Sequence, residues 1–91
     1  MLDIDDGLNI LRMDPDTDTE MIVEGLLKAI PPYIETTTGM SIEEQEDCAL
    51  CDTVSGFLLR LWFFPDGADS EKLQRVVDNL LKTISAMKKR G

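Results

Sequence analysis

The longest apolar run in the chain, CALCDTVSGFLLRLWFF from Cys48 to Phe64, has the periodicity of a helix. Its main apolar residues recur at i, i+4, i+7, i+8, i+11 and i+12, which places them on one helical face: Leu50, Val54, Phe57, Leu58, Leu61 and Trp62. More apolar residues lie off that face toward the end of the run, so the helix needs cover on several sides, from this chain or from another copy. It is shorter than the roughly 20 apolar residues of a membrane span.

The first eleven residues predict a short helix. Ile4, Leu8 and Leu11 recur at i, i+4 and i+7, with Asp3 or Asp5 near the start, where a carboxylate suits the helix dipole.

The N-terminal segment has no basic stretch followed by an apolar core, so we expect no secretory signal. Without such a signal, we expect the two cysteines to be reduced thiols in a cytoplasm.

A second helix is predicted over Met21–Thr37, with Thr17 or Asp18 as its N-cap. Pro31 and Pro32 both lack an N–H group, so we expect this helix to kink or restart near Ile30. Gly39 is a natural end for it, because glycine adopts the left-handed conformation that closes many helices.

An acidic cluster precedes the central apolar run. Ser41 and Glu44 have the spacing of a capping box, which predicts that the central helix begins here, with Glu43, Glu44 and Glu46 in its first turn. The simplest interpretation of these acids is compensation of the helix dipole. Pro65-Asp66-Gly67 ends the helix, because proline cannot continue the hydrogen-bond ladder.

The last segment predicts a long amphipathic helix that starts at Ser70 as N-cap and ends in Lys88-Lys89-Arg90. Its apolar residues recur with 4-3-4-3 spacing, widened by Val76 and Leu81: Leu73, Val77, Leu80, Ile84 and Met87. No segment has the alternation of a strand. The sequence therefore predicts an all-α fold, a single domain over residues 1–91 built as a small bundle of about four helices.

The charge of the chain is large and uneven. The formal net charge is −9, with fourteen acids and two bases up to Gly56, and four acids and seven bases after it. This balance argues against general binding to nucleic acid, whose phosphates repel acidic proteins.

The sequence carries no recognisable catalytic or metal-binding pattern, so we expect no enzymatic activity, no cofactor and no metal. Histidine is absent, which removes the commonest general base and transition-metal ligand. A calcium loop starting at Asp14 would need glycine and glutamate where Thr19 and Gly25 stand. Cys48 and Cys51 form a lone CxxC without the two further Cys or His ligands of a zinc site, which favours two structural thiols in a packed helix.

Several short motifs resemble those of the phage head–tail connector, or adaptor, proteins, which are small helical DNA-packaging proteins. Leu11-Arg12-Met13-Asp14 matches the end of that family's first helix, Asp18 matches the aspartate that opens its second, and Leu61-Trp62-Phe63-Phe64 stands where its third helix ends in a tyrosine-rich segment. The run LLKAIPPYIETTTG from Leu26 to Gly39 matches the family's pattern in order at these positions: Ala29, Tyr33, Ile34, Glu35, Thr38 and Gly39. The Pro-Asp-Gly turn and the long last helix depart from the family, as does the proline pair.

The resemblance implies a structural protein of the virion neck, made in the host cytoplasm. Such a protein assembles as a homo-oligomeric ring under the portal, binds portal and neck or tail proteins, and completes the channel for passing DNA without sequence-specific binding or membrane contact. An alternative is a small acidic cytoplasmic adaptor or regulatory protein that docks on one partner through its last helix. A ring of many copies would distinguish the first from the second, which would be a monomer or dimer.

Two groups of residues are candidates for these contacts. We expect the channel-facing acids to be Glu43, Glu44 and Glu46, and we expect the basic tail to pair with such acids on a neighbouring copy. The candidate oligomer or partner interface comprises Trp62, Phe63, Phe64, Leu73, Val77, Leu80, Ile84, Met87, Lys88, Lys89 and Arg90.

Overall fold

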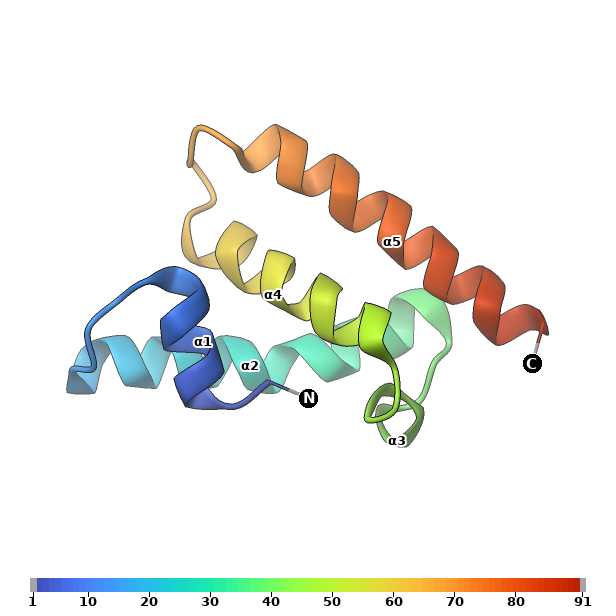
Figure 1. The fold of residues 1–91 in the computed structure, drawn as a ribbon, viewed down its shortest axis with the longest axis horizontal. Coiled ribbons are helices and arrows are strands. Elements are labelled where there is room, and N and C mark those ends of the chain that lie inside the picture. Colours follow the sequence, from blue (N-terminus) through green and yellow to red (C-terminus); the bar gives the residue numbers. More distant parts are fainter. Residues whose placement is uncertain (1, 91) are drawn as a thin grey trace.

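A computed structural model describes residues 2–90, and within them five helices follow one another along the chain (Figure 1). The helices are α1 (Ile4–Leu11), α2 (Thr17–Thr38), α3 (Ile42–Gln45), α4 (Ala49–Phe63) and α5 (Ser70–Arg90). No strand occurs in this part of the chain, so the predicted all-α bundle is confirmed.

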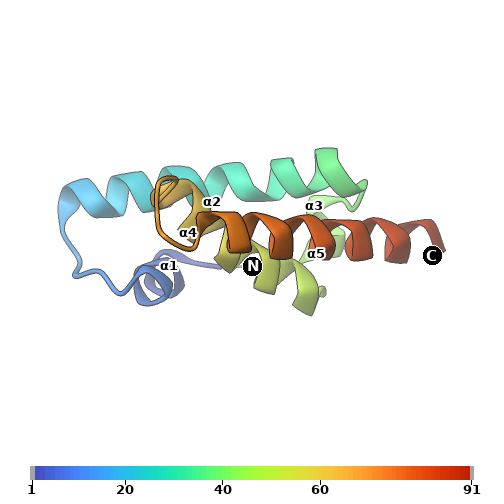
Figure 2. The same ribbon diagram turned by 90° about the horizontal axis from the view of Figure 1, so that it is seen from above.

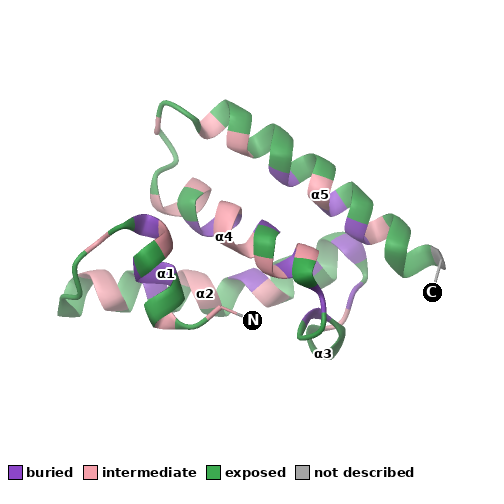
Figure 3. Ribbon diagram, in the orientation of Figure 1, coloured by how far each residue is buried: buried purple, intermediate pink, exposed green. Residues whose placement is uncertain are grey.

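The three long helices build the core. α4 packs on α2, and α5 returns alongside α4 and also contacts α2, while α1 crosses both α2 and α4 (Figures 1 and 2). The molecule measures 42 × 28 × 18 Å, and the start of α2 and the end of α5 lie at opposite ends of its long axis. The largest fully buried side chains come from these three helices (Figure 3): Val23, Ile30, Ile34, Cys51, Val54, Leu58, Leu59, Val77 and Ile84.

Of the two aspartates expected near the start of α1, Asp3 is the N-cap. The Asp6 N–H donates to Asp3 Oδ1 at 2.9 Å and the Asp3 N–H donates to Asp6 Oδ2 at 3.2 Å, which completes a capping box. Gly7 is buried against α2, and a Cβ built on it would lie 2.8 Å from Val23 Cγ1. α1 can therefore approach α2 closely only because residue 7 has no side chain.

α2 is longer than predicted and starts one residue before the expected caps. Asp16 is the N-cap, and its Oδ1 accepts the Thr19 N–H at 2.9 Å. The helix continues through Pro31 and Pro32 as one element, so of the two predicted outcomes, a kink or a restart near Ile30, the restart does not occur. It ends at Gly39, whose φ of 83° is the left-handed conformation predicted for that position.

The central helix does not begin at Ser41. Ser41 and Glu44 do form the predicted capping box, but the helix it opens is the four-residue α3. The Cys48 N–H then donates to the Gln45 carbonyl at 3.1 Å, a three-residue step that ends the α-helical ladder. The Gln45 side chain is buried and donates to the carbonyl oxygens of Pro31 and Met40, both at 3.0 Å, which ties this turn to the end of α2. α4 then starts anew with Cys48 as its N-cap.

The turn between α4 and α5 lies where Pro65-Asp66-Gly67 predicts it. Ser70 was predicted to be the N-cap of α5, but it is the first residue of the helix. The first i→i−4 hydrogen bond runs from the Leu73 N–H to the Asp69 carbonyl, at 2.9 Å, which puts Asp69 at the N-cap position. Among residues 2–90, no helix is both long enough and apolar enough to cross a membrane.

Candidate interaction surfaces

The inner face of α5 belongs to the protein's own core. Val77 and Ile84 are fully buried and Leu81 is nearly so, at i, i+4 and i+7 along the helix. Val77 and Ile84 were candidates for a partner interface, and the structure corrects both, since neither has surface to offer a partner. A charged substitution at Ile84 would unfold the bundle and would not report on assembly.

A second apolar row on α5 is left at the surface. We call it the α5 seam, and it comprises Leu73, Val76, Leu80 and Met87, together with Phe64 from the end of α4. The four helical members are spaced i, i+3, i+7 and i+14, which aligns them beside the core face. Val76 is 41% exposed, Met87 44% and Phe64 46%, while Leu73 and Leu80 are half-buried.

The α5 seam lies on the side of α5 away from α2. The opposite flank of α5 forms a shallow hollow with Tyr33 and Thr37 of α2, so that flank faces the bundle. Near the start of α5, Leu73 shares another hollow with Arg60 of α4 and with Phe64, the C-cap of that helix. The seam therefore continues from the end of α4 onto α5 as one surface.

The aromatic candidates at the end of α4 have different surroundings. Trp62 is half-buried, and its ring meets that of Tyr33 edge to face, with centroids 5.2 Å apart. Phe63 is also half-buried and packs against Phe64 with centroids 4.8 Å apart. Of these aromatic side chains, Phe64 offers the most surface to another molecule.

The start of α2 carries an apolar surface that the sequence pattern did not single out. Met21 is 67% exposed and Ile22 is 54% exposed, whereas the next residue, Val23, is fully buried. Asp16 and Asp18 stand just before them, both exposed. The sequence does contain a sign of this surface, the three adjacent apolar residues from Met21 to Val23. Adjacent residues point in different directions on a helix, so a single buried stripe can take only one of the three.

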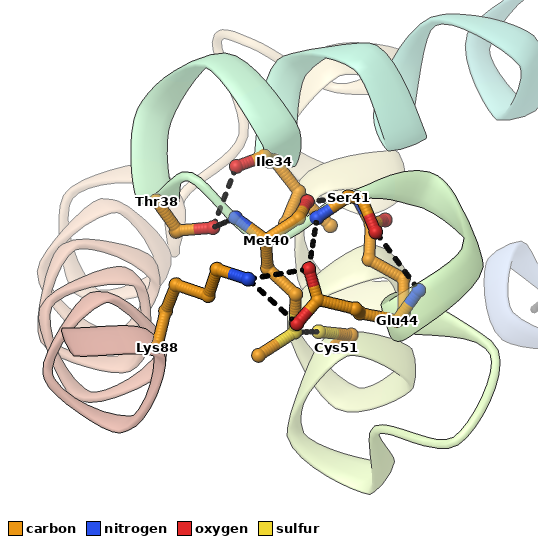
Figure 4. Close-up of polar contacts among 8 residues, drawn as sticks. Ile34, Thr38, Met40, Ser41, Glu44, Cys51 and Lys88 are labelled. Carbon is orange, nitrogen blue, oxygen red and sulfur yellow. Dashed lines mark hydrogen bonds and ion pairs between the residues drawn. The ribbon is translucent and has the colours of Figure 1, made fainter. Parts of the chain in front are cut away.

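The basic tail meets the acidic cluster within one chain (Figure 4). Lys88 Nζ lies 2.7 and 2.8 Å from the two carboxylate oxygens of Glu44. The Lys88 hydrogen bond, helped by Ser41, lowers the pKa of Glu44 below its ordinary value. The expected pairing of these two residues across a subunit contact is therefore corrected, since each already has a partner in its own chain. Glu43, Glu46 and Lys89 are exposed, and the side chain of Arg90 lies outside what the structure describes.

The two cysteines are free and buried. Burial, followed by a hydrogen bond with the Cys48 side chain, raises the pKa of the Cys51 thiol to about 12, so this thiol is protonated at neutral pH. Within the described residues, no group of three or more His, Cys, Asp or Glu side chains is placed to hold a metal ion.

Comparisons with protein-family models, with curated proteins and with solved structures found no match to this chain. Two exposed apolar surfaces remain on the protein as candidates for contact with another molecule, the α5 seam and the Met21–Ile22 pair.

Proposed function

We propose that this protein is a structural subunit of a phage or prophage head–tail connector. In this role it assembles as a ring under the portal, completes the DNA channel after packaging and joins the head to the neck or tail. The observation that carries the proposal is the presence of two unlike apolar surfaces on one subunit, the α5 seam and the Met21–Ile22 pair. Two different complementary patches give a head-to-tail contact, which closes into a ring when the rotation between subunits permits.

The charges around the two surfaces favour the same contact. Arg60 and Asp69 line the hollow at the start of the α5 seam, and the exposed Lys72 stands one residue before Leu73, whereas Asp16 and Asp18 precede Met21 and Ile22 in the chain. Exposed ion pairs contribute only about 0–1 kcal/mol each. We therefore assign most of the affinity to apolar burial, and assign the charges to orientation and to the rate of encounter.

The run that resembles the connector family's second-helix pattern has a structural role at the end of α2. Ile34 is fully buried, Thr38 Oγ1 donates to the Ile34 carbonyl at 2.7 Å, and the same oxygen accepts the Met40 N–H at 3.1 Å. Gly39 then supplies the left-handed turn that directs the chain away from α2. These contacts give Ile34, Thr38 and Gly39 a structural role at the end of α2.

The exposed acids suit a channel wall. Glu43 and Glu46 remain at the surface beside the Glu44–Lys88 pair. Duplex DNA carries one negative charge per about 1.7 Å of its axis, so a wall of like charge would let it pass without sticking.

The test uses two variants with complementary lesions. Met21→Glu places a charge on the α2 surface, and Val76→Glu places one on the α5 seam. Both positions are exposed, so both proteins should fold. We expect the wild type to form large oligomers at high concentration in gel filtration with light scattering, and we expect each variant to be monomeric.

Mixing the two variants tests the head-to-tail geometry directly. Each retains one intact surface, so the mixture should form heterodimers and nothing larger. Asn79→Glu adds the same charge at another exposed position of α5 and is the matched control. If instead two identical α5 seams contact each other, the wild type should form only dimers. Adding Met21→Glu should then not bring Val76→Glu into a complex.

Assembly of this kind can require the portal as a template, so binding to the portal and neck proteins of the same genome is measured as well. A chain that stays monomeric at high concentration and binds none of them would contradict the connector proposal. Binding of one subunit to a single partner helix would instead support the alternative, a small helical adaptor.

A further inference from the structure

Cys51, in the first turn of α4, contacts two other sulfur-containing residues, Met40 and Cys48. Cys51 Sγ lies 3.5 Å from Met40 Sδ (Figure 4), and the Cys51 N–H donates to Cys48 Sγ at 3.1 Å. Cys48 is 8% exposed, Met40 7% and Cys51 1%. The three side chains come from two places, Met40 from the segment after α2 and the two cysteines from the start of α4. Sequence spacing does not reveal that Met40 lies beside Cys51.

The backbone around these sulfurs is fixed by buried hydrogen bonds. The Met40 N–H donates to Thr38 Oγ1 at 3.1 Å, and the Met40 carbonyl accepts from Gln45 Nε2 at 3.0 Å. Cys48 is the N-cap of α4 and Cys51 lies three residues later, so their side chains share one face of the first turn. The site is therefore held in place before any ligand arrives.

Thiolate and thioether donors without histidine or carboxylate select soft metal ions, copper(I) above all. Zinc is a poor fit because its structural sites take four ligands, and only two cysteines are present here. Two sulfurs on one ion at a metal–sulfur distance of ~2.3 Å lie about 4 Å apart in a trigonal arrangement. The 3.5 Å distance between Cys51 Sγ and Met40 Sδ is slightly shorter than this. Methionine has three rotatable bonds, so its sulfur can move the small distance that metal binding requires.

We propose that Met40, Cys48 and Cys51 form a three-sulfur binding site for a soft monovalent metal ion, copper(I) in the cell. Binding replaces the thiol protons of Cys48 and Cys51, which leave to solvent, while the Met40 thioether binds without losing a proton. The complex of one ion and two thiolates carries one negative charge, which suits the N-terminal end of α4. This site is independent of the proposed connector function, because none of its residues belongs to the α5 seam or to the Met21–Ile22 pair.

The probe is copper(I) added anaerobically to the reduced full-length protein in competition with a chromophoric chelator, with silver(I) as a second soft ion. We expect one ion per chain and an ultraviolet charge-transfer band. Since the ion joins the α2–α3 connection to α4, an excess of 100 times Kd should raise the Tm by about 10 °C or more.

The variants are chosen to keep the fold. Cys48→Ser removes a sulfur and retains a preferred N-cap residue, and Met40→Leu removes a sulfur at nearly constant volume. We expect Cys48→Ser to abolish stoichiometric binding and Met40→Leu to weaken it at least tenfold. Met13→Leu, at a half-buried methionine outside the sulfur site and outside both proposed contact surfaces, is the matched control and should bind as the wild type does.

Three results would overturn the proposal: no one-to-one binding to the reduced wild type, unchanged affinity in Met40→Leu, or equal binding to every variant including Cys48→Ser. Circular dichroism establishes that each variant is folded. Oligomeric state is measured in parallel, and loss of metal in Cys48→Ser should leave it unchanged, so the metal site and the connector proposal can fail separately.

Discussion

Replacing Gly7 with alanine should destabilise the protein even though alanine is the better helix former. The added methyl group would lie 2.8 Å from Val23 Cγ1, 3.2 Å from Leu59 Cδ2 and 3.3 Å from Leu27 Cδ1. Carbon atoms pack at about 3.5–4.0 Å, so the first of these contacts is too short by roughly 1 Å. Val23 is fully buried and its β-branched side chain has one strongly preferred rotamer in a helix, so it cannot turn away.

The change in the free energy of unfolding caused by Gly7→Ala is the sum of two opposed effects, overpacking of the core and a gain in helix propensity. Overpacking a core of this kind costs about 1–3 kcal/mol, because α1 must move away from α2 and loosen the packing of Leu8 and Leu11. The gain in helix propensity from glycine to alanine returns roughly 0.5–1 kcal/mol. We expect a net loss of about 1–2 kcal/mol in the free energy of unfolding, or a Tm lower by roughly 5–15 °C.

Urea unfolding followed by circular dichroism measures this change, and a second glycine provides the control. Gly25 is exposed within α2, and a Cβ there would have no neighbour within 4 Å among the described residues. Gly25→Ala should therefore stabilise the protein by about 0.5–1 kcal/mol. Equal stability gains in Gly7→Ala and Gly25→Ala would refute the close approach of α1 to α2.

Two further predictions follow from side-chain contacts. Because Lys88 holds the pKa of Glu44 below its ordinary value, the contribution of this carboxylate to stability is present above the unfolded pKa and is lost as pH falls through the folded one. In the Lys88→Met variant the Glu44 pKa, followed by NMR titration, should rise; an unchanged titration would contradict the contact. Trp62→Ala should lower the free energy of unfolding by about 2–3 kcal/mol, less than for a fully buried aromatic, because Trp62 is half-buried against Tyr33. Trp62→Phe keeps an aromatic ring, so thermal unfolding should show less than half of the stability loss of Trp62→Ala. Equal losses of stability in Trp62→Ala and Trp62→Phe would argue against the ring contact with Tyr33.

The helices and several of their ends were predictable because local chemistry determines them. Asp3, Ser41 and Gly39 act at a range of three or four residues, and each forms the cap that its type and spacing predict. The length of the helix that follows a cap is a different matter. The acids after Ser41 are compatible with a long helix, and the break before Cys48 depends on the Gln45 side chain reaching the Pro31 carbonyl, fourteen residues away.

The surfaces were less predictable, since they depend on how the helices meet. Periodicity gives the apolar residues of the last helix but not which of two adjacent rows turns inward, and the row with Val77 and Ile84 does so. The Glu44–Lys88 contact spans 44 residues, so charge segregation along the sequence was a poor guide to charge segregation in space. The packing of Met40 on Cys51 likewise appears only once α2 and α4 are placed together.

The proline pair within α2 bears on how the chain folds. Without N–H groups at Pro31 and Pro32, the carbonyls of Leu27 and Lys28 lose their usual i+4 donors, so this helix is a poor candidate to form alone. Its second half is held by tertiary contacts, through Ile30 and Ile34 in the core. Helix formation there is thereby coupled to collapse of the bundle. α2, the longest helix within residues 2–90, cannot persist as an independent element when the bundle opens, which makes unfolding more nearly all-or-none than a set of separate helices would suggest.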